Sequence, residues 1–163
     1  GSIKGIGFMP KPEYLEETLE AYIKHIKTYD PEDKTYSKRG LGVLIKYMYG
    51  EEARDRVDFE HIGSLEMAKK HSWANYKVNP QATLLFYQPP MVSFEVRGTM
   101  HIYDEMESGK REFINAQHDM YHTPDMNRWL SYPAYVLDIE EIYDNSATKE
   151  GFGVQLEYPM PKE

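Results

Sequence analysis

The segment MVSFEVRGTMHIY, residues 91–103, has the most regular alternation of apolar and polar side chains in the chain. A period of two predicts a long strand. A strand with one apolar and one polar face is typical of an antiparallel sheet or barrel. The apolar face comprises Val92, Phe94, Val96, Met100 and Ile102, and the polar face comprises Ser93, Glu95, Arg97, Thr99, His101 and Tyr103.

Further strands are predicted on both sides of this segment. ATLLFY (82–87) precedes it and YPAYVLDIEEIYD (132–144) follows it. RVDFEHI (56–62) alternates with a period of two, and LGVLIKYMY (41–49) is a mostly apolar run. These last two segments predict a hairpin, closed by a turn between them. The tail GFGVQLEYPMPKE (151–163) has room for one more short strand.

Three segments are predicted as helices, separated from the strands by polar, turn-rich connections such as residues 30–40. The first covers residues 12–29, where apolar side chains recur every three or four positions behind a proline suited to the first helical position. The second is short, residues 73–78, with Ser72 as its N-cap. The third covers residues 110–122. The stripe of the first helix comprises Leu15, Leu19, Tyr22, Ile23 and Ile26.

The order of these elements predicts one α+β domain over residues 1–163, built on a small antiparallel β-barrel with flanking helices. A length of 163 residues suits a single core. Residues 1 and 2, Gly-Ser, have the character of an expression scar and are left out of the argument. No repeat or linker divides the chain.

Composition excludes several classes of function. The formal net charge of −8 opposes binding to nucleic acid and to anionic membranes. The chain has no cysteine, which excludes disulfides, thiolate metal sites and cysteine nucleophiles. It has neither an apolar run long enough to span a membrane nor a secretory signal, so a cytoplasmic protein is expected.

The run Lys69-Lys70-His71-Ser72 stands out in so acidic a chain. It comes directly before the short predicted helix, whose amide groups and dipole favour an anion at that end. Two ammonium groups and a hydroxyl would meet there, which is the chemistry of a phosphate site. The alternative is an exposed basic loop with an ordinary serine cap; residue types alone leave both open.

Taken together, these motifs resemble the FMN-binding split-barrel family, the pyridoxamine 5'-phosphate oxidase-like proteins. The resemblance covers about residues 43–103, with weaker similarity at 133–144. It rests on the order and spacing of short motifs rather than on any one of them. Those motifs are Lys70, Ser72, Asn75, Asn79-Pro80, the strand Thr83 to Tyr87, Val96-Arg97-Gly98 and the late IEEIYD (139–144).

The resemblance implies a homodimer that binds FMN non-covalently at its interface and acts on a small-molecule substrate. Lys69, Lys70 and Ser72 would contact the phosphate, with His71 beside them. Arg128 and Trp129 of the partner subunit would close the pocket, and Trp73 is a candidate to stack on the ring. The ring and ribityl chain would be lined by Lys46, Tyr47, Glu60, His61 and Ile62.

The chain also departs from the family pattern. GLGVLIKYMYGEE (40–52) stands where members have an opening strand and an acidic-Gly turn, and Ser72 stands where many have a lysine. The C-terminal Arg-Leu-x-Pro signature of pyridoxamine phosphate oxidases is missing, so that activity is not expected. The function expected is a flavin-dependent oxidoreductase that uses a reduced nicotinamide and an unidentified acceptor.

Two alternatives remain open. One is a non-enzymatic protein that binds or stores flavin, deazaflavin or haem on the same fold. The other is an interaction module whose ligand site has decayed.

Other candidate sites are weaker. His118 and His122 are four apart on a predicted helix, a spacing that can hold one metal ion. The glutamate of metalloproteases and a third ligand are missing, so no metal site is expected. Glu140 and Glu141 would point to opposite faces of a strand and form no carboxylate pair.

Overall fold

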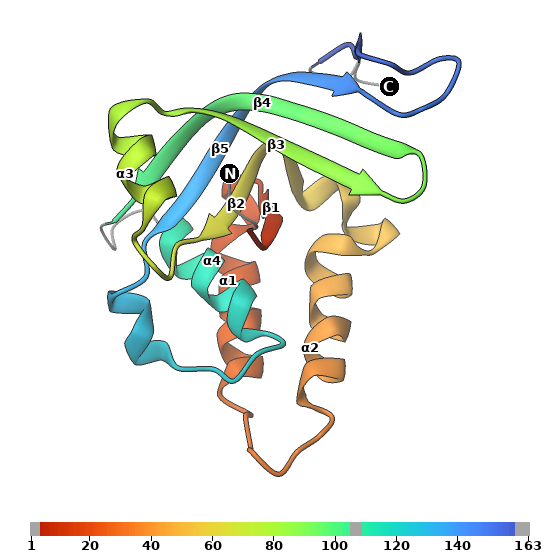
Figure 1. Cartoon of the computed structure of the whole chain (residues 1–163). Helices are drawn as coiled ribbons and strands as arrows, with labels where there is room; N and C mark the ends of the chain where they lie inside the picture. Colours follow the sequence, from red (N-terminus) through yellow and green to blue (C-terminus); the bar gives the residue numbers. More distant parts are fainter. Residues whose placement is uncertain (1–3, 105–108, 159–163) are drawn as a thin grey trace.

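The computed structural model describes residues 4–104 and 109–158, which form an antiparallel sheet with most of the helices on one side (Figure 1). The hydrogen-bonded strand order is β1-β2-β5-β4-β3, and β6 pairs with the C-terminal end of β5. Every pairing is antiparallel. The strands are β1 (Ile6–Pro10), β2 (Val57–Leu65), β3 (Gln81–Gln88), β4 (Val92–Tyr103), β5 (Ala134–Asp144) and β6 (Val154–Gln155).

Most predicted strands are confirmed. Residues 82–87 lie in β3. The segments predicted at 91–103, 132–144 and 56–62 lie in β4, β5 and β2 except for their first one or two residues. Val96 and Met100 of the predicted apolar face of β4 are buried. Strand β1 was not predicted, because IGFMP is short and includes a glycine and a proline.

The strand predicted at residues 41–49 is wrong. This segment is helical, divided between α2 (Tyr36–Leu44) and a π-helical turn, η1 (Ile45–Tyr49), which leads into the 3₁₀ turn η2 (Glu51–Arg56). Leu44 and Met48 are buried four residues apart, so the segment uses a helical face. A short apolar run fits either structure by pattern alone. The predicted hairpin therefore does not form, and β2 pairs with β1 instead.

The predicted first helix is confirmed as α1 (Pro12–Ile26), which ends three residues earlier than expected. Together with α2, η1 and η2, it forms a helical segment, residues 12–56, inserted between the paired strands β1 and β2. The predicted stripe of α1 packs in the first core with α4 (Lys110–Asp119), where Tyr22 stacks on Phe113 at 5.4 Å between ring centroids.

The two faces of the sheet carry different cores. The first core lies between the sheet and the helices, and includes Val136 of β5 and Phe113 of α4. The second core lies on the opposite face, where α3 (His71–Val78) packs at one end. It is smaller; its buried members are Ile62, Val96, Met100, Tyr135 and Leu137.

A bulge lets β5 keep its apolar residues on the second core. The register between β4 and β5 shifts at Arg97/Gly98, so no residue of β4 stands directly opposite Glu140 of β5. At this point the backbones approach so closely that a Cβ on Gly98 would lie 1.9 Å from the carbonyl oxygen of Asp138. The bulge therefore requires glycine at position 98.

The expected barrel is borne out only in part: the sheet is antiparallel, but hydrogen bonds do not close it. Strands β1 and β3 are its two edges. Even so, Ile6 and Phe8 of β1 and Phe86 of β3 line one narrow cavity with Ile62 of β2. The sheet is therefore curled enough for its edges to approach each other.

Within the described residues, no helix has the length and apolar character needed to cross a bilayer.

A candidate anion-binding cleft

The loop from β2 to α3 is anchored by one buried carboxylate. Glu66 is only 2% exposed. One oxygen accepts hydrogen bonds from Lys4 Nζ at 2.8 Å and from the Tyr135 hydroxyl at 2.7 Å. The other accepts from the backbone N–H groups of Ala68 and Lys69, each at 2.7 Å. Glu66 thereby fixes the backbone on which the basic residues stand.

Glu66 is ionised across the physiological range. Burial by itself would raise its pKa, but the bonds from Lys4, Tyr135 and the two amides outweigh burial and lower the pKa to about 2. The pKa of the Tyr135 hydroxyl is raised, chiefly by burial and then by its hydrogen bond to Glu66. The pair is therefore a carboxylate and a neutral phenol.

Helix α3 (His71–Val78) begins two residues earlier than predicted. Its N-cap is Lys70, and His71 and Ser72 lie in its first turn, so the prediction that Ser72 caps the helix is wrong. The Lys70 carbonyl accepts the N–H of Ala74 at 3.1 Å. The first turn of any helix presents its N–H groups at the end rather than to the helix itself. That end is where the basic run lies.

A cleft of about 630 Å³ opens beside this turn. Three elements form its walls: α3, the edge strand β3, and the segment that runs from Lys4 into the other edge strand, β1. Its volume lies in the range of small-molecule sites. The lining residues are Lys4, Ile6, His71, Ser72, Asn75, Tyr76 and the run Thr83, Leu84, Leu85, Phe86 and Tyr87.

The structure brings part of the predicted site together. His71 and Ser72 line the cleft, and Ile62 lines the cavity next to it. Lys69 and Lys70 are exposed on the loop that leads to it. Lys69 Nζ lies 3.9 Å from Asp104 and 5.1 Å from the ring centre of Trp73.

Trp73 is in contact with cations rather than with the open cleft. Lys77 Nζ lies 4.2 Å from its ring centre, in addition to Lys69. The ring also packs on Tyr135 in the second core, 6.4 Å between centroids. Stacking of Trp73 on a ligand ring stays a prediction.

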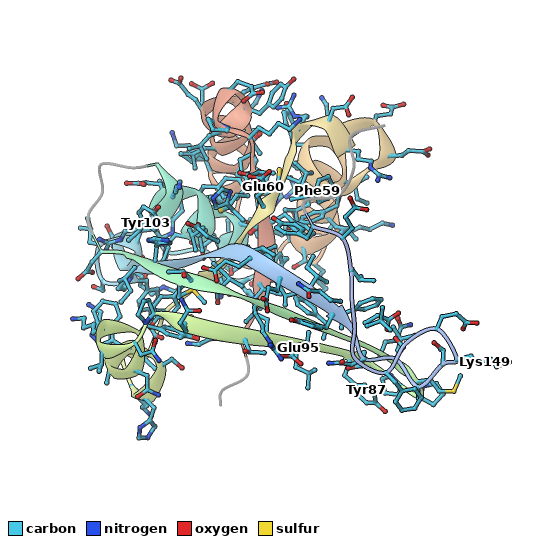
Figure 2. The ribbon with its side chains drawn as sticks, turned by 90° about the horizontal axis from the view of Figure 1, so that it is seen from above. Phe59, Glu60, Tyr87, Glu95, Tyr103 and Lys149 are labelled. Atoms are coloured by element: carbon cyan, nitrogen blue, oxygen red, sulfur yellow. The ribbon has the colours of Figure 1, made fainter. Side chains whose placement is uncertain are left out.

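Two predicted residues lie elsewhere on β2. Figure 2 labels Glu60 and its neighbour Phe59 on this strand, well separated from α3. Glu60 is exposed. His61 binds Asp58 through Nδ1 at 2.6 Å and Asp138 through Nε2 at 3.2 Å. Asp138 also binds His101 at 2.9 Å.

The remaining predicted residues lie away from the cleft within this subunit. Tyr47 of η1 packs on the first core, and Lys46 beside it is exposed. Trp129, in the 3₁₀ turn η4 (Met126–Leu130), is buried, and its Nε1 donates to Asp119 at 2.8 Å. Arg128 donates to the Thr123 carbonyl at 2.9 Å. A role for these residues across a dimer interface stays a prediction.

Several cleft residues escaped sequence reasoning. Lys4 and Ile6 come from the edge strand region that was not predicted, and Tyr76 was not singled out within α3. Glu66 gave one usable signal, since it stands alone between an apolar strand and the basic run. Nothing in the sequence indicated its burial.

His118 and His122 do lie together, with ring centroids 4.4 Å apart. His118 Nδ1 is 3.0 Å from Asp119. Among the described residues no group of three His, Asp or Glu side chains is placed to hold a metal ion.

Searches against models of known protein families and against curated proteins found no match to this chain.

Proposed function

We propose that this protein binds FMN in the cleft between α3 and the edge strands, on a split-barrel arrangement of its antiparallel sheet. The observation that carries the proposal is that His71 and Ser72, in the first turn of α3, line the cleft directly after the exposed Lys69 and Lys70. The chain as a whole carries a charge of −8. A local cationic site is what allows such a surface to bind a phosphate.

The phosphate would sit at the first turn of α3. There it receives backbone N–H groups, the positive end of the helix dipole and the basic side chains. The loop is already fixed in place by Glu66 through the amides of Ala68 and Lys69. A prearranged site loses less conformational freedom on binding.

The ring system would occupy the apolar part of the cleft. Leu84 and Phe86 of β3 and Ile6 of β1 line that part, and Tyr76 adds a hydroxyl. Such a mixture of apolar walls and a few polar groups is typical of cofactor sites. The flavin supplies the redox chemistry when bound, and these residues hold and orient it. A reduced nicotinamide would be the electron donor.

A homodimer fits the exposed side chains next to the cleft. Leu85 and Tyr87 of β3 are 68% and 62% exposed, and Met91 in the hairpin turn is also exposed. Tyr87 lies at the end of the β3–β4 hairpin remote from α3 (Figure 2). Large apolar side chains gathered in one place are typical of protein interfaces. A second subunit on this edge would cover the open side of the cleft.

The phosphate contact can be tested by comparing FMN with riboflavin. Replacing Lys70 and Ser72 by alanine should weaken FMN binding by about two to four orders of magnitude and riboflavin binding much less, because charge-assisted bonds contribute roughly 1.5–3 kcal/mol each. Titration calorimetry would measure both. The matched control is Ser37→Ala with Lys38→Ala, an exposed pair on α2.

Equal losses for the two ligands would refute the phosphate assignment. The absorbance spectrum of the purified protein would show whether flavin is bound. Anaerobic addition of a reduced nicotinamide then distinguishes an oxidoreductase from a non-enzymatic flavin-binding protein. Flavin that is reduced indicates the oxidoreductase. Flavin that is held but stays oxidised indicates the non-enzymatic binding protein.

A further inference from the structure

A second cavity, of about 470 Å³, lies across β1 from the cleft. Its walls come from β1 and β2 on one side and from α2, η1 and α4 on the other. Ile6 lines both cavities, so β1 is the wall between them. The second cavity exists because the helical segment 12–56 is inserted between β1 and β2 and brings Leu41, Leu44 and Tyr49 over the strands.

The two cavities differ in charge. None of the described residues that line the second cavity is a lysine, arginine, aspartate or glutamate. The cleft, in contrast, has Lys4 and His71 in its lining and Lys69 and Lys70 close by. Much of the second cavity is apolar, through Leu41, Leu44, Leu65 and Met67. A charged ligand would lose its hydration there and meet no lysine, arginine or carboxylate among the described residues of the lining.

One hydroxyl is held in place against β1. Gln117 Nε2 donates to the Tyr49 hydroxyl at 2.8 Å. The pair lies so close to the strand that a Cβ on Gly7 would be 2.6 Å from the Tyr49 oxygen and 2.7 Å from Gln117 Oε1. Because the phenol oxygen already accepts from Gln117, its own hydrogen can be donated to an acceptor in the cavity.

Flat aromatic groups lie at another part of the wall. The rings of His118 and His122 stack at 4.4 Å with 27° between their planes, and Tyr121 lies 4.6 Å from His122. Burial first, and then the charge of His118, lower the pKa of His122. This shift favours the uncharged form of His122. Aromatic faces of this kind favour a flat ring as their partner.

We propose that this second cavity binds a neutral, flat aromatic compound that carries a carbonyl group. The ring would lie between the leucine side chains and the histidine rings. The carbonyl oxygen would accept the hydrogen of Tyr49. Among the described residues, this site shares Ile6 with the FMN cleft but none of the cleft's polar residues.

The test uses 2-acetylnaphthalene as the probe, with two analogues of nearly the same shape. 2-Ethylnaphthalene lacks the acceptor, and 2-naphthoate carries a negative charge. Titration calorimetry on the full chain, supported by saturation-transfer NMR, should show saturable binding of the ketone. Each analogue should bind at least about tenfold more weakly than the ketone.

Two variants locate the site. Tyr49→Phe should lower the affinity for the ketone about tenfold and leave that for 2-ethylnaphthalene unchanged. Tyr87→Phe, a matched change at an exposed tyrosine of the cleft, should alter neither. Leu41 is 54% exposed on the cavity rim, so Leu41→Trp should fold normally, as circular dichroism would confirm, and block both ligands.

Three outcomes would overturn the proposal: no saturable binding of the ketone, equal effects of Tyr49→Phe on ketone and hydrocarbon, or undiminished binding in Leu41→Trp. Stoichiometric displacement of the probe by FMN would overturn it as well, by placing both ligands in one site. Failure of FMN to bind at all would refute the cofactor proposal and leave this one standing.

Discussion

The two faces of the sheet differ in how completely they are covered. On the first face, α1 and α4 seal a core in which Tyr22, Phe113 and Met120 are fully buried. On the second face, α3 contributes no fully buried residue, and the cleft opens beside it. Away from the second cavity at its β1–β2 edge, the first face has the packing that stabilises a fold. The second face has the larger cleft, with its accessible polar groups.

The largest expected effect lies on the first face. Phe113→Ala should lower the free energy of unfolding by about 3–5 kcal/mol, because it leaves a cavity where a fully buried ring stacked on Tyr22. Urea denaturation would measure the loss. Leu85→Ala, on an exposed position of β3, is the control and should cost about 0.5 kcal/mol or less. Similar losses for both would contradict the contrast between the faces.

Glu66 is the exception on the second face, since it is buried and ionised. Glu66→Gln should lower the free energy of unfolding by roughly 2–4 kcal/mol at neutral pH, because it removes the negative charge that accepts hydrogen bonds from Lys4, Tyr135 and two backbone amides. Denaturation at pH 7 would measure this. The isosteric change keeps the size of the side chain, so a negligible loss would show that the charge contributes little.

The same carboxylate predicts a pH dependence. Its folded pKa of about 2 lies below the ordinary value of 4.5, so the stability it contributes is fully present above pH 4.5 and is lost as pH falls toward 2. Urea denaturation at pH 5, 4 and 3 should show that the free energy of unfolding falls more steeply with decreasing pH for the wild type than for Glu66→Gln. Parallel declines would contradict the depressed pKa.

The exposed hairpin residues should matter for assembly rather than for folding. If a second subunit covers this edge, Leu85→Glu with Tyr87→Glu should weaken dimerisation about a hundredfold, because two large apolar contacts become buried charges. Light scattering over a concentration series would measure it. Lys46→Glu with Lys38→Glu, on exposed helical positions, is the control. A monomeric wild type would refute the dimer.

The smallest expected effect is at the surface of α3. Lys77→Ala removes a cation that lies 4.2 Å from the ring centre of Trp73. The loss should be about 0.5–1 kcal/mol, as for other exposed cation–π contacts. Chemical denaturation detects a change of this size. Lys24→Ala, at an exposed position of α1, is the control.

The sequence was most informative where apolar side chains recur with one regular period along an element. β4 alternates with a period of two and α1 repeats every three to four residues, so both were predicted with nearly correct bounds. Residues 41–49 do contain helical spacing, at Leu41, Leu44, Ile45 and Met48. They misled because Val43, Tyr47 and Tyr49 make the segment an almost continuous apolar run.

Only the part of the candidate site that is contiguous in the sequence could be predicted. The basic run before α3 was recognised because it is local, whereas Lys4 and the β3 wall of the cleft reach it through tertiary structure. The burial of Glu66 depends on Tyr135, 69 residues later. The N-cap of α3 is Lys70 rather than Ser72, which the residue types alone did not indicate.

The insertion of residues 12–56 between two paired strands has a consequence for the order of folding. Strands β3 and β4 are joined by a tight turn, whereas β1 can reach β2 only after a long loop has closed. Loop closure costs entropy that grows slowly with length, so the chain tolerates the detour but forms that contact late. The β2–β5 pairing spans a still longer stretch of chain, so by the same argument both pairings should form after the β3–β4 hairpin. The cavities would acquire their shared wall when β1 joins the sheet.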